Sequence, residues 1–149
     1  VIDMVHNHHN YAWRERHDEK DLWVVRKGAT PAFPGQRGFV GGSMGDDAAI
    51  VEGIDSDEAR AALYSTVHGA GRLFGRKEAK RRFARDEMDK WLQERGVILI
   101  GADLDESPMA YRRLPDVLAK HSGSIKVLHT LRPFAVAMAG SGEFDPFKD

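Results

Sequence analysis

A single histidine followed by glycines is the part of this sequence best suited to chemistry on a phosphate. Residues 68–72 read HGAGR, so His68 is followed by Gly69 and Gly71 and then by Arg72. A neutral imidazole can attack phosphorus, and the glycines leave room for a phosphate to approach the backbone. Arg72 would stabilise charge that develops on the phosphate oxygens. The segment predicts a nucleophile; a buried, hydrogen-bonded histidine in a tight turn is the competing interpretation.

A second glycine-rich segment covers residues 41–45, with the sequence GGSMG. Its backbone N–H groups are free to face an anion. The segment lacks the Gly-Lys-Ser/Thr ending of a nucleotide-binding P-loop, and a tight turn has the same composition. Arg26 and Lys27, just before Gly28, offer positive charge for a phosphate or RNA, or simply face solvent.

Three histidines, His6, His8 and His9, lie within four positions near the beginning of the chain. In an extended segment His6 and His8 share one face and His9 lies on the other, so a single strand cannot easily present all three to one ion. The pattern favours one metal ligand with two supporting histidines, and a polar surface loop is the alternative. A complete site needs about three or four protein ligands.

Composition sets limits on the class of protein. At 149 residues and 42% hydrophobic, the chain can form one globular core. It has no cysteine, which excludes disulfides and thiolate zinc sites in this stretch. No membrane span or signal peptide is evident, so a cytoplasmic location is expected. The chain starts at Val1 without a methionine, and we expect it to be part of a larger protein.

The formal net charge is −1, yet the charges are unevenly distributed. Residues 46–58 carry six acids and no lysine or arginine. Residues 72–85 carry seven bases against the single acid Glu78. Such a basic run can attract a polyanion, although a solvated helix face is the simpler explanation.

Hydrophobic patterns and turn residues predict a mixture of strands and helices without regular alternation, which indicates an α+β fold. We expect residues 1–11 to form an extended or loop segment, residues 27–45 a long loop, and residues 141–149 a disordered tail. No domain boundary is evident within residues 1–140. The expected strands are 22–25, 48–53, 97–100, 125–130 and 134–138, and the expected helices are 56–63, 76–95 and 115–121.

Taken together, the motifs resemble the carboxy-terminal part of the RtcB family of RNA ligases, up to about Gly140. The resemblance rests on their order and approximate spacing, with His9-Asn10, residues 26–30 (RKGAT), 42–45 (GSMG), 68–72 (HGAGR), 108–111 (PMAY) and 131–133 (LRP). It implies that His68 becomes guanylylated and that His9 binds manganese. By the same resemblance, the nucleotide is contacted by His9, Asn10, Gly41, Gly42, Ser43, Met44, Gly69, Ala70, Gly71 and Tyr111.

The resemblance also implies a reaction. GTP and two manganese ions would guanylylate His68, GMP would pass to an RNA 3′-phosphate derived from a 2′,3′-cyclic end where needed, and a 5′-hydroxyl would seal the strand. An archease-type activating protein is a possible partner. Four positions depart from the family pattern: Gly41 replaces a common proline, Ala48 and Gly75 replace serines, and Ala139 replaces a lysine that helps to read guanine. The remaining metal ligands would lie upstream. These departures suggest RNA repair rather than tRNA splicing.

Two other functions compete with RNA ligation. A metal-dependent phosphoesterase acting on RNA ends could use His9 with upstream ligands, but hydrolysis by water needs no glycine-flanked histidine. A non-catalytic RNA-binding remnant could rely on the basic run of residues 72–85.

Overall fold

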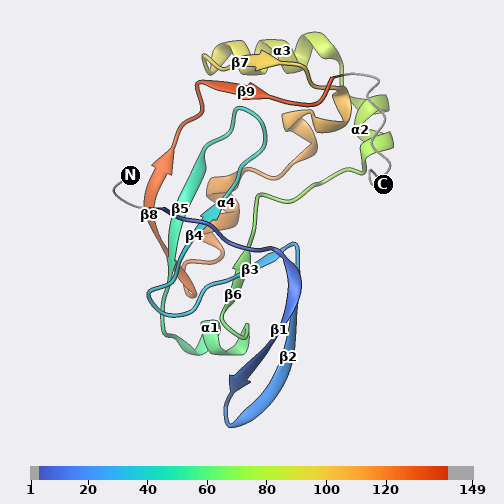
Figure 1. The fold of residues 1–149 in the computed structure, drawn as a ribbon. Coiled ribbons are helices and arrows are strands. Elements are labelled where there is room, and N and C mark those ends of the chain that lie inside the picture. The colour runs from blue at the N-terminus through green and yellow to red at the C-terminus, as the bar shows by residue number, and fades with distance from the viewer. Residues whose placement is uncertain (1–3, 141–149) are drawn as a thin grey trace.

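The computed structural model describes residues 4–140 of the chain. Small sheets and few helices make up this part, which is compatible with the predicted α+β class (Figure 1). Along the chain the elements are β1 (Asn10–His17), β2 (Lys20–Lys27), β3 (Ala29–Pro31), β4 (Arg37–Val40), β5 (Ala48–Gly53), α1 (Asp57–Ala61), β6 (Ser65–Val67), α2 (Arg76–Arg82), α3 (Arg85–Glu94), β7 (Ile98–Ile100), the 3-10 helices η1 (Leu104–Glu106) and η2 (Pro108–Ala110), α4 (Leu114–Ala119), β8 (Ile125–Leu131) and β9 (Ala135–Ala137).

The strands pair in four small sheets. β1 and β2 form an antiparallel hairpin, β3 pairs with β6, and β4, β5 and β8 form an antiparallel sheet in that order. β7 and β9 are parallel. In Figure 1 the hairpin projects at one end of the molecule, and β7, β9 and α3 lie at the opposite end.

The hairpin turn explains why β1 escapes prediction. Asp18 and Glu19 connect the strands, and both have positive φ angles of 46° and 63°. Two consecutive residues with positive φ give the turn twist that two-residue hairpins need, and glycine or asparagine is the usual choice. Because neither is present here, the sequence carries no turn signal, and only the core of β2 was recognisable as a strand.

Two of the sequence predictions are wrong about element boundaries. The expected loop at residues 27–45 contains β3 and β4, whose partners β6 and β5 come later in the chain. The expected helix at residues 76–95 is interrupted because Phe83 and Ala84 are extended, with ψ angles of 148° and 153°. Neither glycine nor proline marks that break. The second helix starts where Glu87 accepts a hydrogen bond from the Ala84 N–H at 3.2 Å.

The other predicted elements are present with small shifts. β5 has the predicted bounds, and β2, β8, β9 and α4 overlap their predicted segments. The expected helix at 56–63 is shorter, and Ser56 caps it by accepting from the Ala59 N–H at 3.0 Å. The strand at 97–100 was predicted to be buried; instead Ile98 and Ile100 are each 63% exposed, since β7 pairs with β9 alone.

Two apolar clusters hold this part of the chain together. The first packs the sheet of β4, β5 and β8 against α4 and includes Val40, Val51 and Leu114. The second packs α3 against the glycine-rich segment and includes Met44, Met88 and Leu92. The predicted tail at 141–149 lies outside the described residues. None of the helices found between residues 4 and 140 is long and apolar enough to span a membrane.

Candidate functional site around His68

His68 follows β6 directly, and the glycine-rich segment of residues 41–45 lies beside it. The Ala70 N–H donates to the Gly41 carbonyl at 3.0 Å, and the Gly41 N–H to the His68 carbonyl at 3.4 Å. Gly41 and Gly69 therefore form a parallel bridge between two segments that are distant in sequence. A side chain at Gly69 would place its Cβ 3.1 Å from the Gly41 carbonyl oxygen, so the close approach depends on glycine.

His9 stacks on His68. The ring centroids are 4.8 Å apart and the rings are inclined by 20°. The His9 carbonyl accepts from the Gly28 N–H at 2.9 Å, which fixes the start of β1 to the end of β2. Gly28 has a φ of +70°, and a Cβ there would lie 3.6 Å from His68 Nε2. Three separate segments thus converge on one exposed imidazole.

The surroundings of His68 favour its neutral form. Partial burial of the ring lowers the pKa of His68 below its ordinary value, and the nearby His9 lowers it further because two positive rings repel. A neutral imidazole has a free lone pair on one nitrogen, which is the form needed for attack on phosphorus.

A cavity of about 630 Å³ opens beside His68. One side is formed by Gly28, the segment 68–71 and Tyr111. The other side comes from α4 and the residues just before it, which supply Arg112, Arg113, Asp116, Val117, Lys120 and His121. This volume lies within the range of small-molecule sites. Arg113 is paired with the Asp46 carboxylate, so Arg112 and Lys120 against Asp116 leave an excess of positive charge that suits an anionic ligand. The α4 side was not foreseen, because its residues match no motif.

The segment 41–45 contacts the backbone of residues 68–70 but lies outside the cavity. A Cβ on Gly42 would lie 2.3 Å from the Asp47 carbonyl oxygen, so only glycine fits there. The Met44 side chain is buried in the second apolar cluster. Because its side chain is buried, Met44 could contact a nucleotide only through its backbone.

Asp46, at the end of that segment, fastens it to α4. The Asp46 carboxylate accepts from Arg113 at 2.9 Å and from the Leu114 N–H at 3.3 Å. Asp46 is buried, so this contact fixes the start of α4 relative to residues 41–45.

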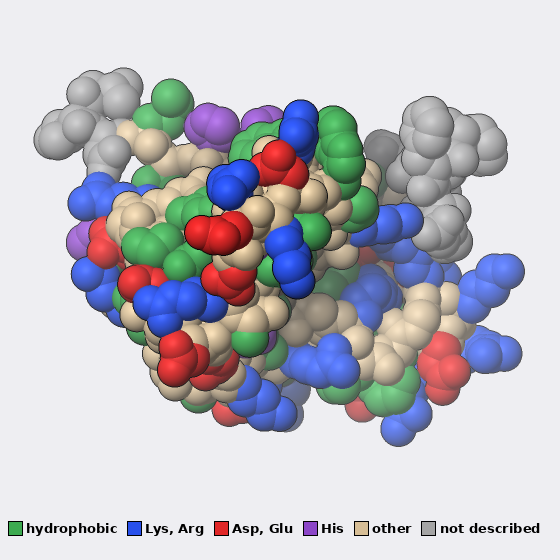
Figure 2. Space-filling view, turned by 90° about the horizontal axis from the view of Figure 1, so that it is seen from below, with side chains coloured by type: hydrophobic (Ala, Val, Ile, Leu, Met, Phe, Trp, Pro, Cys, Tyr) green, Lys and Arg blue, Asp and Glu red, His purple; other side chains and the backbone are tan. Residues whose placement is uncertain are grey.

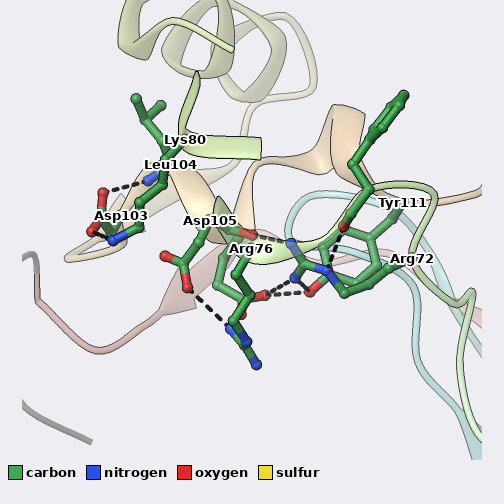
Figure 3. A network of polar contacts seen from close by, with 9 residues as sticks. Arg72, Arg76, Lys80, Asp103, Leu104, Asp105 and Tyr111 are labelled. Carbon is green, nitrogen blue, oxygen red and sulfur yellow. Dashed lines mark hydrogen bonds and ion pairs between the residues drawn. The ribbon is translucent and has the colours of Figure 1, made fainter. Parts of the chain in front are cut away.

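Arg72 is held by a polar network rather than pointing freely at the cavity (Figure 3). Its guanidinium donates to the Tyr111 hydroxyl at 2.6 Å, to the Phe74 carbonyl at 3.0 Å and to the Asp105 carbonyl. It also lies over the Tyr111 ring, 4.7 Å from the centroid. The Tyr111 hydroxyl donates to Glu106. Arg72 thus helps to build the wall that carries Tyr111, and its expected contact with a phosphate stays a prediction.

The sequence does not reveal Glu106, which joins this network from η1. Burial raises the pKa of Tyr111 to about 12, and the hydrogen bond to the Glu106 carboxylate adds to this effect. The adjacent acids Asp105 and Glu106, just before the turn that begins at Pro108, were the available signal, but their pattern does not indicate which side chains they bind.

Arg26 does not contact the cavity. Its side chain is 1% exposed and donates to the Glu15 carboxylate, to Ser65 Oγ at 2.9 Å and to the Leu63 carbonyl at 2.9 Å. An arginine so enclosed does not present its guanidinium to solvent in this structure, and the expected contact of Arg26 with an RNA phosphate stays a prediction. Lys27 is exposed and pairs across the hairpin with Asn10, next to His9. The side chain of Lys27 remains available for a phosphate.

The described residues do not form a metal site by themselves. No group of three or more histidine and carboxylate side chains between residues 4 and 140 is arranged to hold an ion. His6 and His8 contact each other edge to face at 5.5 Å, whereas His9 packs on His68. His9 is thus separated from the other two histidines, as the alternation of an extended segment predicts. One histidine is an incomplete ligand set for any metal.

Charge outside the cavity is mixed. In Figure 2 lysine and arginine side chains gather on the right, the side on which α2 lies in Figure 1, while the near face carries both signs. Several bases of the run at residues 72–85 are paired: Arg76 with Asp105 and Lys80 with Asp103. This pairing agrees with a partly neutralised helix face more than with a uniform polyanion track.

Comparison with known proteins agrees with the motif pattern. The family model described as tRNA-splicing ligase RtcB matches residues 1–139. The RNA-splicing ligase RtcB of Escherichia coli strain K12 is 35% identical over 132 residues, covering 89% of this chain and 32% of that protein. The tRNA-splicing ligase RtcB of Thermococcus kodakarensis is 34% identical over 152 residues, covering 87% and 31%. The chain spans about a third of the length of these two relatives.

Proposed function

Because the chain belongs to the RtcB family, we propose that it forms the part of an RNA ligase that carries the nucleophile His68. The observation that carries this proposal is the exposed imidazole beside a cationic cavity, with His9 stacked on it. The longer protein that contains this chain would join RNA 3′-phosphate or 2′,3′-cyclic phosphate ends to 5′-hydroxyl ends, using GTP.

The proposed first step is attack of a His68 ring nitrogen on the α-phosphorus of GTP. A P–N bond forms while the bond from the α-phosphorus to the bridging oxygen breaks, and pyrophosphate leaves. The lowered pKa of His68 supports this step because the ring stays neutral near pH 7. Arg112 and Lys120 line the cavity and would bind the anionic groups that approach along it, while Arg113 is held by Asp46.

In the proposed second step an oxygen of the RNA 3′-phosphate attacks the phosphorus held by His68, and the histidine leaves. Protonation makes imidazole a good leaving group, and the proton can be taken from solvent because His68 is exposed. In the third step the RNA 5′-hydroxyl attacks the activated 3′-phosphorus, a phosphodiester forms and GMP is released. Glycines at 69 and 71 leave the approach to His68 free of side chains.

Manganese belongs to this proposal as a requirement of the whole protein. Two ions would polarise phosphate oxygens when bound. Of the described residues we assign only His9 as a ligand, and its partners would come from outside residues 4–140. Asn10 and Lys27, at the paired ends of the hairpin, would contact nucleotide phosphates. An archease-type protein is a candidate activator, and RNA repair is favoured over tRNA splicing.

Recognition of guanine would differ in detail from many members of the family. Ala139 stands where a lysine is common, and its own side chain has no polar group. Its carbonyl instead accepts from the Ala102 N–H at 3.0 Å and holds the end of β9 in place. We therefore propose weaker discrimination between GTP and other purine nucleotides than a lysine would give.

The test uses the full-length parent protein with manganese and GTP labelled at the α-phosphate. We expect a covalent label on the wild type that is acid-labile and base-stable, and its loss in His68→Ala. His129→Ala is a matched control, since His129 is exposed on β8 and does not line the cavity. Absence of a label, or a label that survives in His68→Ala, would refute the ligase proposal. Release of phosphate from RNA ends without GTP would then favour the phosphoesterase.

A further inference from the structure

We propose that Glu106 is a positioning residue that fixes the ring of Tyr111 as one wall of the cavity beside His68. The proposal rests on the proposed function, because the cavity is taken to receive the nucleotide. Glu106 would hold the Tyr111 ring in one orientation before the nucleotide binds. Binding of the nucleotide base would then not bear the entropy cost of ordering that ring.

The two oxygens of the Glu106 carboxylate bind different partners. Oε2 accepts from the Tyr111 hydroxyl and lies 3.5 Å from Arg72 Nη1. Oε1 accepts from Arg76 at the start of α2. The Glu106 side chain is 18% exposed, so these contacts are partly shielded from water. Figure 3 shows Arg72 and Arg76 approaching the same region of η1 from two directions, with Tyr111 beside Arg72.

The Tyr111 hydroxyl is fully used within the protein. It donates its proton to Glu106 and accepts from Arg72 Nη1 at 2.6 Å. A phenol has one proton to donate, so the hydroxyl has no proton left for a ligand. Tyr111 nevertheless lines the cavity. What it offers there is its ring, and aromatic rings bind nucleobases by stacking, which is sensitive to orientation.

Arg72 also holds Tyr111, through the hydrogen bond from Nη1 to the Tyr111 hydroxyl at 2.6 Å, but as a cation it cannot accept the hydroxyl proton as Glu106 does. Its Nε donates to the Phe74 carbonyl at 3.0 Å and its Nη2 to the Asp105 carbonyl, so the backbone holds the guanidinium in place. Lying over the Tyr111 ring at 4.7 Å, it contacts the ring without fixing the hydroxyl proton. Loss of the Glu106 charge would leave Arg72 and Arg76 facing each other near Tyr111 without the carboxylate that both contact. The Tyr111 hydroxyl would then keep its contact with Arg72 but lose the acceptor of its proton, so we expect the ring to be held less firmly while the fold around it persists.

The kinetic test measures initial rates of His68 labelling against GTP concentration in the full-length protein. One charge-assisted hydrogen bond corresponds to roughly a tenfold change in affinity. We expect Glu106→Gln to raise the KM for GTP about tenfold while the maximal rate of labelling changes much less. Glu94→Gln is the matched control: Glu94 ends α3, is exposed, and its side chain makes no hydrogen bond or ion pair within residues 4–140. We expect its KM to equal that of the wild type.

Two tyrosine variants separate positioning from general stability. Tyr111→Phe keeps the ring but removes its hydrogen bond to Glu106, so its KM should rise less than that of Tyr111→Ala, which removes the ring. Should Glu106→Gln fail to fold, Tyr111→Phe decides: a KM that is raised with an unchanged maximal rate supports the proposal, and an unchanged KM overturns it. A Glu106→Gln protein that folds and has the wild-type KM, or that loses only maximal rate, overturns the proposal as well.

A second measurement does not depend on catalysis. Tyrosine labelled with carbon-13 at Cζ reports the ionisation of Tyr111 by NMR, with Tyr111→Phe providing the assignment. Because Glu106 contributes to the raised pKa of Tyr111, Glu106→Gln should lower it, and an unchanged pKa would overturn the contact. If the wild type never forms a label, the proposed function fails, whereas this titration still decides whether Glu106 holds Tyr111.

Discussion

His9 and His68 stack with their ring centroids 4.8 Å apart, although one precedes the first strand and the other follows the sixth. The contact is made possible by Gly28, whose N–H binds the His9 carbonyl and whose lack of a side chain leaves space next to His68. A histidine that we assign to metal binding therefore touches the histidine that we assign to nucleophilic attack. This proximity makes the protonation of His68 dependent on its neighbour.

Replacement of His9 by alanine should raise the pKa of His68. The substitution exposes the His68 ring to water and removes the repulsion between two imidazolium rings, and both changes favour the protonated form. The pKa can be followed by NMR titration of the His68 ring in full-length protein freed of metal by a chelator. His8→Ala is the matched control, since His8 contacts Tyr11 and Trp13 but makes no ring contact with His68. An equal pKa in the wild type and in His9→Ala would contradict the electrostatic link.

Gly28→Ala should impair labelling of His68 more than it impairs folding. Gly28 has a φ of +70°, and an alanine Cβ would lie 3.6 Å from His68 Nε2, where it shields that nitrogen from an incoming phosphate. An alanine forced into this backbone region costs about 1–2 kcal/mol. We expect a loss of stability of that size, together with a strong decrease in the rate of labelling at saturating GTP.

Gly35→Ala separates backbone strain from crowding. Gly35 has a similar φ of +78°, yet a Cβ there would meet nothing within 4 Å. Both variants should therefore lose similar free energy of unfolding, about 1–2 kcal/mol, whereas only Gly28→Ala should lose labelling. Equal labelling defects in the two variants would mean that strain alone, and not proximity to His68, accounts for the effect.

The sequence predicted the site better where one segment acts locally than where segments meet. His68 is exposed and is followed by Gly69 and Gly71, and a histidine open to a ligand could be anticipated here because the glycines are a local signal. The stacking of His9 on His68 depends on the register of a hairpin whose turn, Asp18-Glu19, has no glycine or asparagine. Local patterns carry no information about such a contact.

The contacts of charged residues also could not be predicted from the local sequence. Arg26 and Arg72 both follow or precede glycines near phosphate-type motifs, so a contact with phosphate was reasonable from the sequence. In the structure the carboxylate or carbonyl that binds each one comes from a different element: Glu15 on β1 for Arg26, and Asp105 on η1 for Arg72. Tertiary packing decides whether an arginine faces a ligand or a buried partner. The local sequence around the arginine does not reveal that partner.

Arg26→Met should destabilise the protein strongly without acting on the phosphate chemistry itself. The Arg26 side chain is 1% exposed and that of Glu15 is 8% exposed, so the substitution removes the arginine from a buried carboxylate that keeps its contact with His17 Nε2 at 2.8 Å. Removing one partner of a buried pair costs roughly 3–5 kcal/mol. Chemical denaturation of the full-length protein measures this. The matched control is Arg14→Met, since Arg14 pairs with Asp21 at 2.8 Å but is 65% exposed. Its cost should stay below about 1 kcal/mol.

The pH dependence of this pair gives an independent check. Burial disfavours the charged form of Glu15, but hydrogen bonds from Arg26 and His17 outweigh it and hold the pKa of Glu15 below its ordinary value. The stabilisation is therefore complete above that ordinary value and is lost as the pH falls toward the lower pKa of the folded state. In Arg26→Met the Glu15 carboxyl should instead prefer its protonated form, so the difference in unfolding free energy between wild type and variant should shrink on acidification. A difference that stays constant between neutral and acidic pH would show that the loss comes from packing and not from the charge of Glu15.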